Sequence, residues 1–166
     1  MKKLSYWFPL IVLAIIVVTT AESCSNKKLS KNKISQIIYS FGDSSVPPQY
    51  HRSYTITATP ENIRIVVDSY GNILADTTYQ MTKESFGSLV DNFNESKIIS
   101  IKKVDDQDGC TGGTSKYIKI YEGDKIIFDG YAYFCGGKIF GDMKGDFDSF
   151  ATEIKCLIPD LSKLLE

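Results

Sequence analysis

The feature that most constrains the fold is a turn signal, Glu122-Gly123-Asp124, that separates two strand-like runs. The runs cover residues 117–121 and 125–134 and are rich in tyrosine, isoleucine and phenylalanine, which are typical of β-strands. Two such runs joined by a short turn that contains glycine predict a β-hairpin. The chain is therefore expected to build an antiparallel sheet, because hairpin neighbours run in opposite directions.

The register of this hairpin brings two of the four cysteines close together. If the turn residues are Gly123 and Asp124, Cys135 lies opposite residue 112 and Cys110 lies opposite residue 137. Such diagonal neighbours can be bridged after a modest adjustment, so we predict a Cys110–Cys135 disulfide. A zinc site is disfavoured, since the chain has one histidine and no Cys-x-x-Cys pair. The glycine pairs after both cysteines predict tight bends, with an anion-binding nest as the alternative.

The part of the chain before the hairpin predicts further antiparallel strands. Apolar and polar residues alternate with a period of two, which is typical of half-buried strands. The predicted strands cover residues 34–41, 50–59, 63–67, 73–79 and 98–101, with turn signals at 60–62 and 68–72. Strands joined by short turns predict a meander.

Two segments change to the helical period, in which apolar residues recur at intervals of three and four. Thr82 and Asp146 are the predicted caps, because their side chains can accept a hydrogen bond from a free backbone amide. The apolar stripes are Phe86, Leu89, Val90 and Phe93 in the first helix, and Phe147, Phe150, Ala151 and Ile154 in the second. The predicted fold class is therefore α+β, a mostly antiparallel sheet with two helices packed on one face.

Two further expectations concern the C-terminal region. Residues 135–146 contain four glycines and are predicted to form a loop. Cys156, which follows the second apolar stripe, is predicted to be a buried free thiol, because unpaired cysteine behaves as a small hydrophobic residue.

The first 23 residues have the layout of a secretory signal peptide. A positive start, Met1-Lys2-Lys3, precedes an apolar block over residues 7–18, and small or polar residues follow. The alternative is an uncleaved membrane anchor. A spanning helix needs about 20 apolar residues, and this block reaches that length only by recruiting polar neighbours.

The end of this segment is similar to one family of signals. Residues 21–25, Ala-Glu-Ser-Cys-Ser, resemble the end of a bacterial lipoprotein signal peptide, in which the cysteine becomes the first mature residue and carries the lipid. The resemblance implies lipid attachment at Cys24 and a membrane partner bound through that lipid. It also implies a place in the bacterial cell envelope, anchored outside the cytoplasm. A secreted soluble protein, cleaved after Ser23, is the alternative.

The chain is accordingly divided into three parts. Residues 1–23 are the signal peptide, residues 24–33 are a basic, flexible tether, and residues 34–166 are a single α+β domain. The domain itself resembles no family that we recognise.

Charge and motif content exclude several classes of function. The chain has 19 basic and 20 acidic residues, whereas a protein that coats nucleic acid needs a basic excess to neutralise phosphates. The acidic run 105–108 fails the calcium-loop pattern, because Ser115 stands where a glutamate is required. Asp142, Asp146 and Asp148 are better explained by helix capping, with a calcium site shared between the two acidic loops as the alternative. We predict no nucleic-acid partner, no metal and no cofactor.

His51 is the single histidine and hence the one histidine candidate for general-base catalysis. Asp43, Ser44 and Ser45 lie nearby in the sequence as candidate acid and nucleophiles, but no hydrolase motif such as G-x-S-x-G is present. We therefore assign no catalytic residue and favour a protein that is not an enzyme. A small envelope hydrolase that uses His51 is an alternative function.

The segment 47–54 is the most attractive partner surface, because it combines proline, tyrosine and arginine. Its candidate contact residues are Tyr50, His51, Arg52 and Tyr54. The leading hypothesis is a non-catalytic binding protein, of the inhibitor or immunity type, that recognises an envelope protein. A structural component of the envelope is a third hypothesis.

Overall fold

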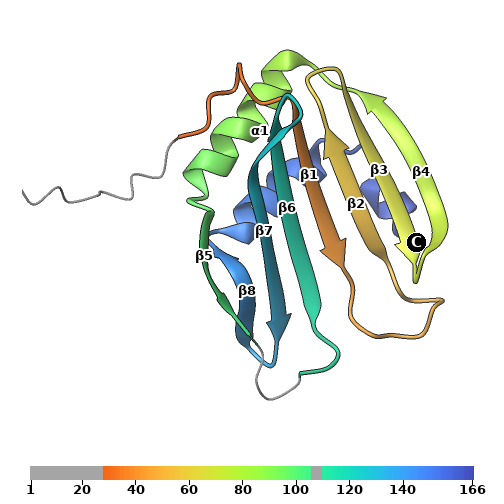
Figure 1. Ribbon diagram of the computed structural model, residues 1–166. Helices are drawn as coiled ribbons and strands as arrows, with labels where there is room; N and C mark the ends of the chain where they lie inside the picture. Colours follow the sequence, from red (N-terminus) through yellow and green to blue (C-terminus); the bar gives the residue numbers. More distant parts are fainter. Residues whose placement is uncertain (1–27, 106–109) are drawn as a thin grey trace, which may run out of the picture.

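The computed structural model describes residues 28–105 and 110–166 (Figure 1). The strands are β1 (Gln36–Gly42), β2 (Ser53–Ala58), β3 (Asn62–Ser69), β4 (Asn72–Gln80), β5 (Ile99–Val104), β6 (Thr114–Glu122), β7 (Lys125–Cys135) and β8 (Lys138–Lys144). The helices are α1 (Lys83–Glu95), α2 (Phe147–Cys156) and α3 (Leu161–Leu164). The predicted signal peptide and Cys24 lie outside the described residues.

The eight strands of the described residues form one antiparallel sheet in the order β4-β3-β2-β1-β6-β7-β8-β5 (Figure 1). The first four strands follow one another as the predicted meander, and β6, β7 and β8 are a second run of neighbours. β1 and β6 join the two halves, with Tyr39 opposite Ile118. The prediction of a mostly antiparallel sheet with helices is confirmed, and strands dominate the fold.

Both predicted helices are present, and each begins at its predicted cap. Thr82 Oγ1 accepts a hydrogen bond from Ser85 N at 3.1 Å, and Asp146 Oδ1 accepts one from Ser149 N at 2.9 Å. Both predicted apolar stripes are buried in one core cluster, together with strand residues that include Ile37, Ile56, Ile65, Ile118 and Ile120. Burial of these stripes supplies most of the stability of such helices, because isolated helices of this length are marginal in water.

Phe150 connects the parts of this core. Its ring lies 6.2 Å from the ring of Tyr39 in β1 and 5.5 Å from the ring of Phe93 in α1, both in edge-on geometry. The buried residues of the cluster run from Ile34 to Ile158. The described residues therefore share one buried core, and we expect residues 28–166 to fold on their own.

The described part of the predicted tether is not free of the domain. Asn94, near the end of α1, accepts a hydrogen bond from Leu29 N at 2.7 Å and donates one to Leu29 O at 3.0 Å. Lys31 forms an ion pair with Asp91 at 3.0 Å. This segment therefore lies against α1. Its contacts join residues far apart in the sequence, and its polar, basic composition does not predict them.

The predicted Cys110–Cys135 disulfide is confirmed, with the two Cα atoms 6.1 Å apart. Next to the turn the hairpin has the predicted register, but a β-bulge beyond Tyr121 shifts the pairing by one residue, so that Thr114 pairs with Phe134. A bulge inserts one unpaired residue into a strand, and the turn residues carry no signal for it.

The prediction of a loop over residues 135–146 is wrong, because residues 138–144 form β8. Gly136 and Gly137, with φ angles of 58° and 73°, lie between the two strands. A two-residue hairpin turn of this kind needs positive φ at both positions. Gly141 lies within β8, where a Cβ atom would come within 2.1 Å of Tyr131 O. The glycines therefore serve a tight turn and a close backbone approach.

Cys156 is a free thiol, as predicted, but it is exposed, so the prediction of its burial is wrong. It is the last residue of α2, two positions after the buried Ile154. Successive residues of an α-helix are rotated by about 100°, so residues two apart point to different sides.

Candidate functional site

One corner of the sheet is built where the loop between β1 and β2 meets the turn between β3 and β4. Ser69 Oγ donates a hydrogen bond to Pro48 O at 2.8 Å. The hydroxyl of Tyr70, in the turn, donates one to Val46 O at 2.7 Å. Two side chains of the turn region thus fix the proline-containing loop, so its surface is largely organised before any partner arrives.

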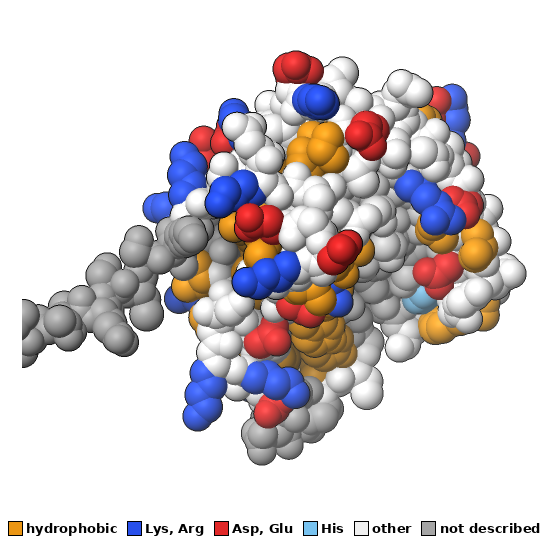
Figure 2. Space-filling model, turned by 45° about the horizontal axis from the view of Figure 1, so that its top comes forward, with side chains coloured by type: hydrophobic (Ala, Val, Ile, Leu, Met, Phe, Trp, Pro, Cys, Tyr) orange, Lys and Arg blue, Asp and Glu red, His pale blue; other side chains and the backbone are white. Residues whose placement is uncertain are grey.

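Aromatic and apolar side chains are exposed around this corner. Tyr50 is 68% exposed, Tyr70 57% and Ile73 61%, and Pro47 and Pro48 are exposed beside them in the chain. We call Pro47, Pro48, Tyr50, Tyr70 and Ile73 the corner patch. Figure 2 shows hydrophobic side chains gathered near the single histidine. Exposed apolar groups that gather in one place mark interaction sites, whereas single ones do not.

His51 lies beneath this patch, 6% exposed, with its ring stacked on Tyr70 at 4.0 Å between centroids. Its Nε2 lies 3.3 Å from Ser53 Oγ, and its Nδ1 has no partner within the described residues. The Asp43 carboxylate instead accepts hydrogen bonds from the amides of Ser44 and Arg52. A Ser-His-Asp triad needs the acid on the second ring nitrogen, and in the described residues Asp43 does not occupy that position.

The four predicted contact residues occupy different environments. Tyr50 is exposed, while the Arg52 guanidinium donates to the backbone carbonyls of His51 and Glu166 at 2.9 and 2.5 Å. Tyr54 is 6% exposed and stacks on Phe41, and its burial raises the pKa of its hydroxyl. The structure therefore brings Tyr50 to the surface and places His51 and Tyr54 inside the domain.

The sequence pattern missed two members of the corner patch, Tyr70 and Ile73. Tyr70 has a φ angle of 52° and Gly71 one of 86°, so both adopt the left-handed conformation of a tight hairpin turn. Glycine or asparagine is usual at the first position. The sequence does contain one signal for this exposure: Tyr70 comes directly before Gly71 within a predicted turn, and turn residues are usually exposed.

The strand that follows the patch, β4, is one edge of the sheet. From Ala75 to Gln80 it pairs with β3 in regular register. Its single charge, Asp76, is neutralised by Arg64 through hydrogen bonds of 2.7 and 2.5 Å. The other edge, β5, carries Lys102 and Lys103 and pairs irregularly with β8. The β3–β4 pairing also has a register shift, between Val67 and Asp68. Lysines and irregularities protect edges from strand addition, so the regular part of β4, from Ala75 to Gln80, is the more accessible edge.

The acidic residues considered for calcium have other partners. Asp142 Oδ1 accepts a hydrogen bond from Tyr131 N at 2.7 Å, Asp146 caps α2, and Asp148 pairs with Lys116 at 2.5 Å. Asp106 and Asp108 lie outside the described residues. Within residues 28–105 and 110–166, no group of three or more metal-ligating side chains is found.

The Lys116–Asp148 pair predicts a dependence of stability on pH. The hydrogen bond and charge of Lys116 lower the pKa of the Asp148 carboxyl, so the carboxylate stabilises the native state above its ordinary pKa of 3.8. This contribution is lost as the pH falls through the lowered pKa. The Asp148→Asn variant should be slightly less stable than the parent at pH 7, and this difference should shrink as the pH falls below about 3.8, in urea titrations. Because Asp148 is 92% exposed, high salt should shrink the difference. A difference that grows on acidification would contradict this role.

Comparisons with protein-family models, curated proteins and solved structures find no match for this chain. None of the helices in the described residues has the length and hydropathy needed to cross a bilayer. The described residues form one antiparallel sheet with helices and an exposed apolar corner. This corner is the candidate functional surface.

Proposed function

We propose that this chain is a non-catalytic binding protein of the bacterial cell envelope, of the inhibitor or immunity type, anchored outside the cytoplasm by a lipid on Cys24. The anchoring rests on the lipoprotein-like segment 21–25, which precedes the described residues. The binding role rests on one observation, the corner patch beside the accessible edge β4. Its partner is an envelope protein that presents an apolar groove or a free strand.

The corner patch has the composition of a binding hot spot. Tyrosine supplies a large apolar area together with a polar group and loses little conformational entropy on binding. The loop that carries Tyr50 is fixed by its hydrogen bonds to Ser69 and Tyr70, so little further ordering opposes association. Next to it, the free N–H and C=O groups along β4 can accept a partner strand.

The placement of the patch suits an anchored protein. In Figure 1 the chain enters the domain beside α1, and the turn between β3 and β4 lies at the far side of the sheet. We infer that α1 and α2 cover one face of the sheet, which leaves this far corner and the β4 edge as the parts directed away from the anchor. A partner can then reach the patch while the opposite end of the domain stays close to the membrane.

Truncation of the patch is expected to weaken capture of the partner. Tyr50→Ala should weaken binding about 30-fold, the effect of a hot-spot residue, and Ile73→Ser should weaken it several-fold. The full chain, expressed in its native envelope with a photo-reactive residue at position 72, should give one discrete cross-linked protein. That product should disappear in Tyr50→Ala and decrease in Ile73→Ser.

A matched control comes from apolar residues exposed elsewhere. Ile139 in β8 and Ile126 in β7 are 52% and 45% exposed, so Ile139→Ser and Ile126→Ser make the same kind of surface change away from the corner. Both controls should retain the cross-linked product. Equal loss in patch and control variants, or no loss in either, would contradict a binding role for the corner patch.

A further inference from the structure

A surface distinct from the corner patch is a strip of three tyrosines on β6 and β7. Tyr117 pairs with Tyr131 across the two strands, and Tyr133 lies two positions farther along β7. We call Tyr117, Tyr131 and Tyr133 the tyrosine strip. Alternate residues of a strand point to opposite faces, and the neighbouring Ile118 and Ala132 are buried in the core. The strip therefore lies on the face of the sheet that is turned away from the core, which is toward the viewer in Figure 1, with α2 behind the strands.

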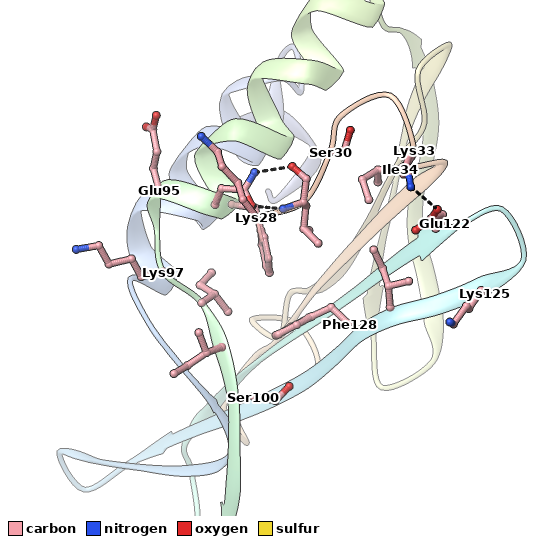
Figure 3. Close-up of a pocket in the computed structure, with 16 residues that line it drawn as sticks. Lys28, Ser30, Lys33, Ile34, Glu95, Lys97, Ser100, Glu122, Lys125 and Phe128 are labelled. Carbon is pink, nitrogen blue, oxygen red and sulfur yellow. Dashed lines mark hydrogen bonds and ion pairs between the residues drawn. The ribbon is translucent and has the colours of Figure 1, made fainter. Parts of the chain in front are cut away.

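The strip is separate from a pocket of about 780 Å³ on the core side of β7 (Figure 3). That pocket lies where the N-terminal segment, the end of α1 and β7 meet, and its lining includes Lys97 and Phe128. Phe128 pairs with Ile120, which is fully buried. The next residue, Asp129, pairs with Lys119 on the face of the strip. The two sides of β7 therefore carry separate surfaces.

Tyr133 is held down on the sheet. Its hydroxyl donates a hydrogen bond to Cys110 O at 3.0 Å and accepts one from Gly113 N at 3.2 Å. A Cβ atom at Gly113 would come within 2.7 Å of the Tyr133 ring, so the ring lies directly over this glycine. Cys110 is itself joined to β7 by its disulfide with Cys135. The orientation of the ring is thus set before any ligand arrives, which lowers the entropic cost of binding.

The other two tyrosines lie diagonally along the sheet. Burial is the main cause of the raised pKa of both hydroxyls; a hydrogen bond with Ser115 partly offsets the rise at Tyr131, and one with Asp129 adds to it at Tyr117. Ser115 lies two positions from Tyr117 on β6, and Asp129 two positions from Tyr131 on β7, so each hydroxyl reaches a diagonal neighbour on the other strand. A tyrosine that reaches such a neighbour lies along the sheet and turns one ring face outward. Tyr131 is accordingly 40% exposed.

The charges beside the strip neutralise each other. Lys119 Nζ lies 3.4 Å from Asp129 Oδ2 and 5.2 Å from the centroid of the Tyr117 ring. On the other side of β6, β1 places the uncharged Ile38 and Ser40 beside Lys119 and Tyr117. A ligand that complements this surface therefore needs no net charge. It needs flat apolar faces for the rings and polar groups for their edges.

We propose that the tyrosine strip binds a linear, uncharged oligosaccharide with β-1,4 linkages. The faces of its sugar rings carry C–H groups, which pack on the electron-rich faces of aromatic rings. Its hydroxyls donate to and accept from the polar groups between the rings, such as Asp129 and Ser115. A β-1,4-linked chain is an extended ribbon and matches rings laid along a sheet, whereas an α-1,4-linked chain coils. This inference goes beyond protein binding at the corner patch and does not depend on it.

The test is calorimetric titration of residues 28–166 with cellohexaose and with chitohexaose, which share the β-1,4 linkage and differ in their N-acetyl groups. We expect saturable binding of at least one of them, with one oligosaccharide per chain. Tyr131→Ala and Tyr117→Ala should each weaken binding about 10-fold or more, the effect of one lost ring contact. Tyr131→Phe keeps the ring and should stay within about 3-fold of the parent. Tyr50→Ala makes the same truncation in the corner patch and should bind as the parent does.

Maltohexaose, which has α-1,4 linkages, should bind about 10-fold more weakly or not at all. The proposal is overturned by a lack of saturable binding to both β-1,4 chains, by equal binding of maltohexaose, or by equal losses in Tyr131→Ala and Tyr50→Ala. The cross-linking experiment on the corner patch gives an independent readout. Tyr131→Ala should leave its protein product unchanged, and loss of that product together with unchanged oligosaccharide binding would make the strip a protein interface instead.

Discussion

Replacing Phe150 by alanine is expected to lower the free energy of unfolding by about 3–5 kcal/mol. Phe150 is fully buried and contacts both Tyr39 in β1 and Phe93 in α1. Truncation removes its apolar area from the core and leaves a cavity where α1, α2 and the sheet meet, since close-packed surroundings relax only in part. Domains are typically stable by about 5–15 kcal/mol, so the loss takes a large share of the total.

Urea titration of residues 28–166 measures this loss, with two further variants for comparison. Phe150→Leu conserves most of the volume and should lose less than about 1.5 kcal/mol. Ile139→Ala truncates a residue that is 52% exposed and should lose less than about 1 kcal/mol. If Phe150→Ala were no worse than Ile139→Ala, α2 would not be packed into the core as described.

The elements that could be predicted are those whose signals lie within a few residues of one another. Thr82 and Asp146 cap helices through side chains that bond amides three residues on, and the apolar stripes repeat within two turns. The β6–β7 hairpin is likewise local. The neighbouring positions of β1 and β6, and of β5 and β8, depend on the assembly of the whole sheet, and no short pattern encodes them.

The residues whose environment was predicted wrongly have a related explanation. The period of two in 50–59 holds from Ser53, where β2 begins, but His51 and Tyr50 precede the strand and follow the path of the loop. The burial of His51 is set by its contact with Tyr70, from another turn, whereas Tyr50 is exposed. Gly141 resembles a loop residue in the sequence because the strand that it approaches closely is visible only in three dimensions.

The candidate site was predictable in part. Tyr50 was identified from composition, and it is exposed in the corner patch. Tyr70 and Ile73 come from a different hairpin, so only the fold brings them beside it. The pocket lined by Lys97 and Phe128 likewise combines α1, the N-terminal segment and β7. Hydrophobic periodicity describes one strand or helix at a time. It therefore cannot predict a surface that is assembled from several elements.

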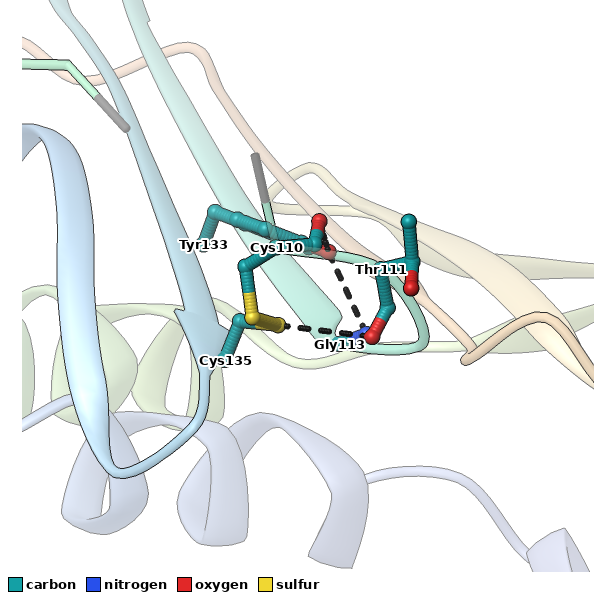
Figure 4. Close-up of a disulfide and its surroundings, with 5 residues drawn as sticks. All are labelled: Cys110, Thr111, Gly113, Tyr133 and Cys135. Atoms are coloured by element: carbon teal, nitrogen blue, oxygen red, sulfur yellow. Dashed lines mark hydrogen bonds between the residues drawn. A yellow bond between two sulfur atoms is a disulfide. The ribbon is translucent and has the colours of Figure 1, made fainter. Parts of the chain in front are cut away.

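Removing the Cys110–Cys135 bridge is expected to lower the free energy of unfolding by about 3–4 kcal/mol. The bridge joins cysteines 25 positions apart, and a loop of this length restricts the unfolded chain considerably in the chain-entropy model. In the native state the bridged loop is also held by Tyr133, whose hydroxyl donates to Cys110 O at 3.0 Å and accepts from Gly113 N at 3.2 Å (Figure 4). The fold should therefore survive without the bridge, because these bonds and the β6–β7 ladder remain.

The exposed thiol of Cys156 determines how the stability lost with the disulfide is measured. A free, exposed thiol can attack a disulfide and exchange partners, so the comparison is made in residues 28–166 that already carry Cys156→Ser. That substitution alone should change stability by less than about 0.5 kcal/mol, since the side chain is exposed. Adding Cys110→Ser and Cys135→Ser should then produce the full loss in urea titrations, with the circular dichroism spectrum of the native sheet retained at zero urea. A loss below about 1 kcal/mol would show that the Tyr133 contacts and the sheet already restrict this loop in the unfolded chain, and the entropic account of the bridge would be wrong.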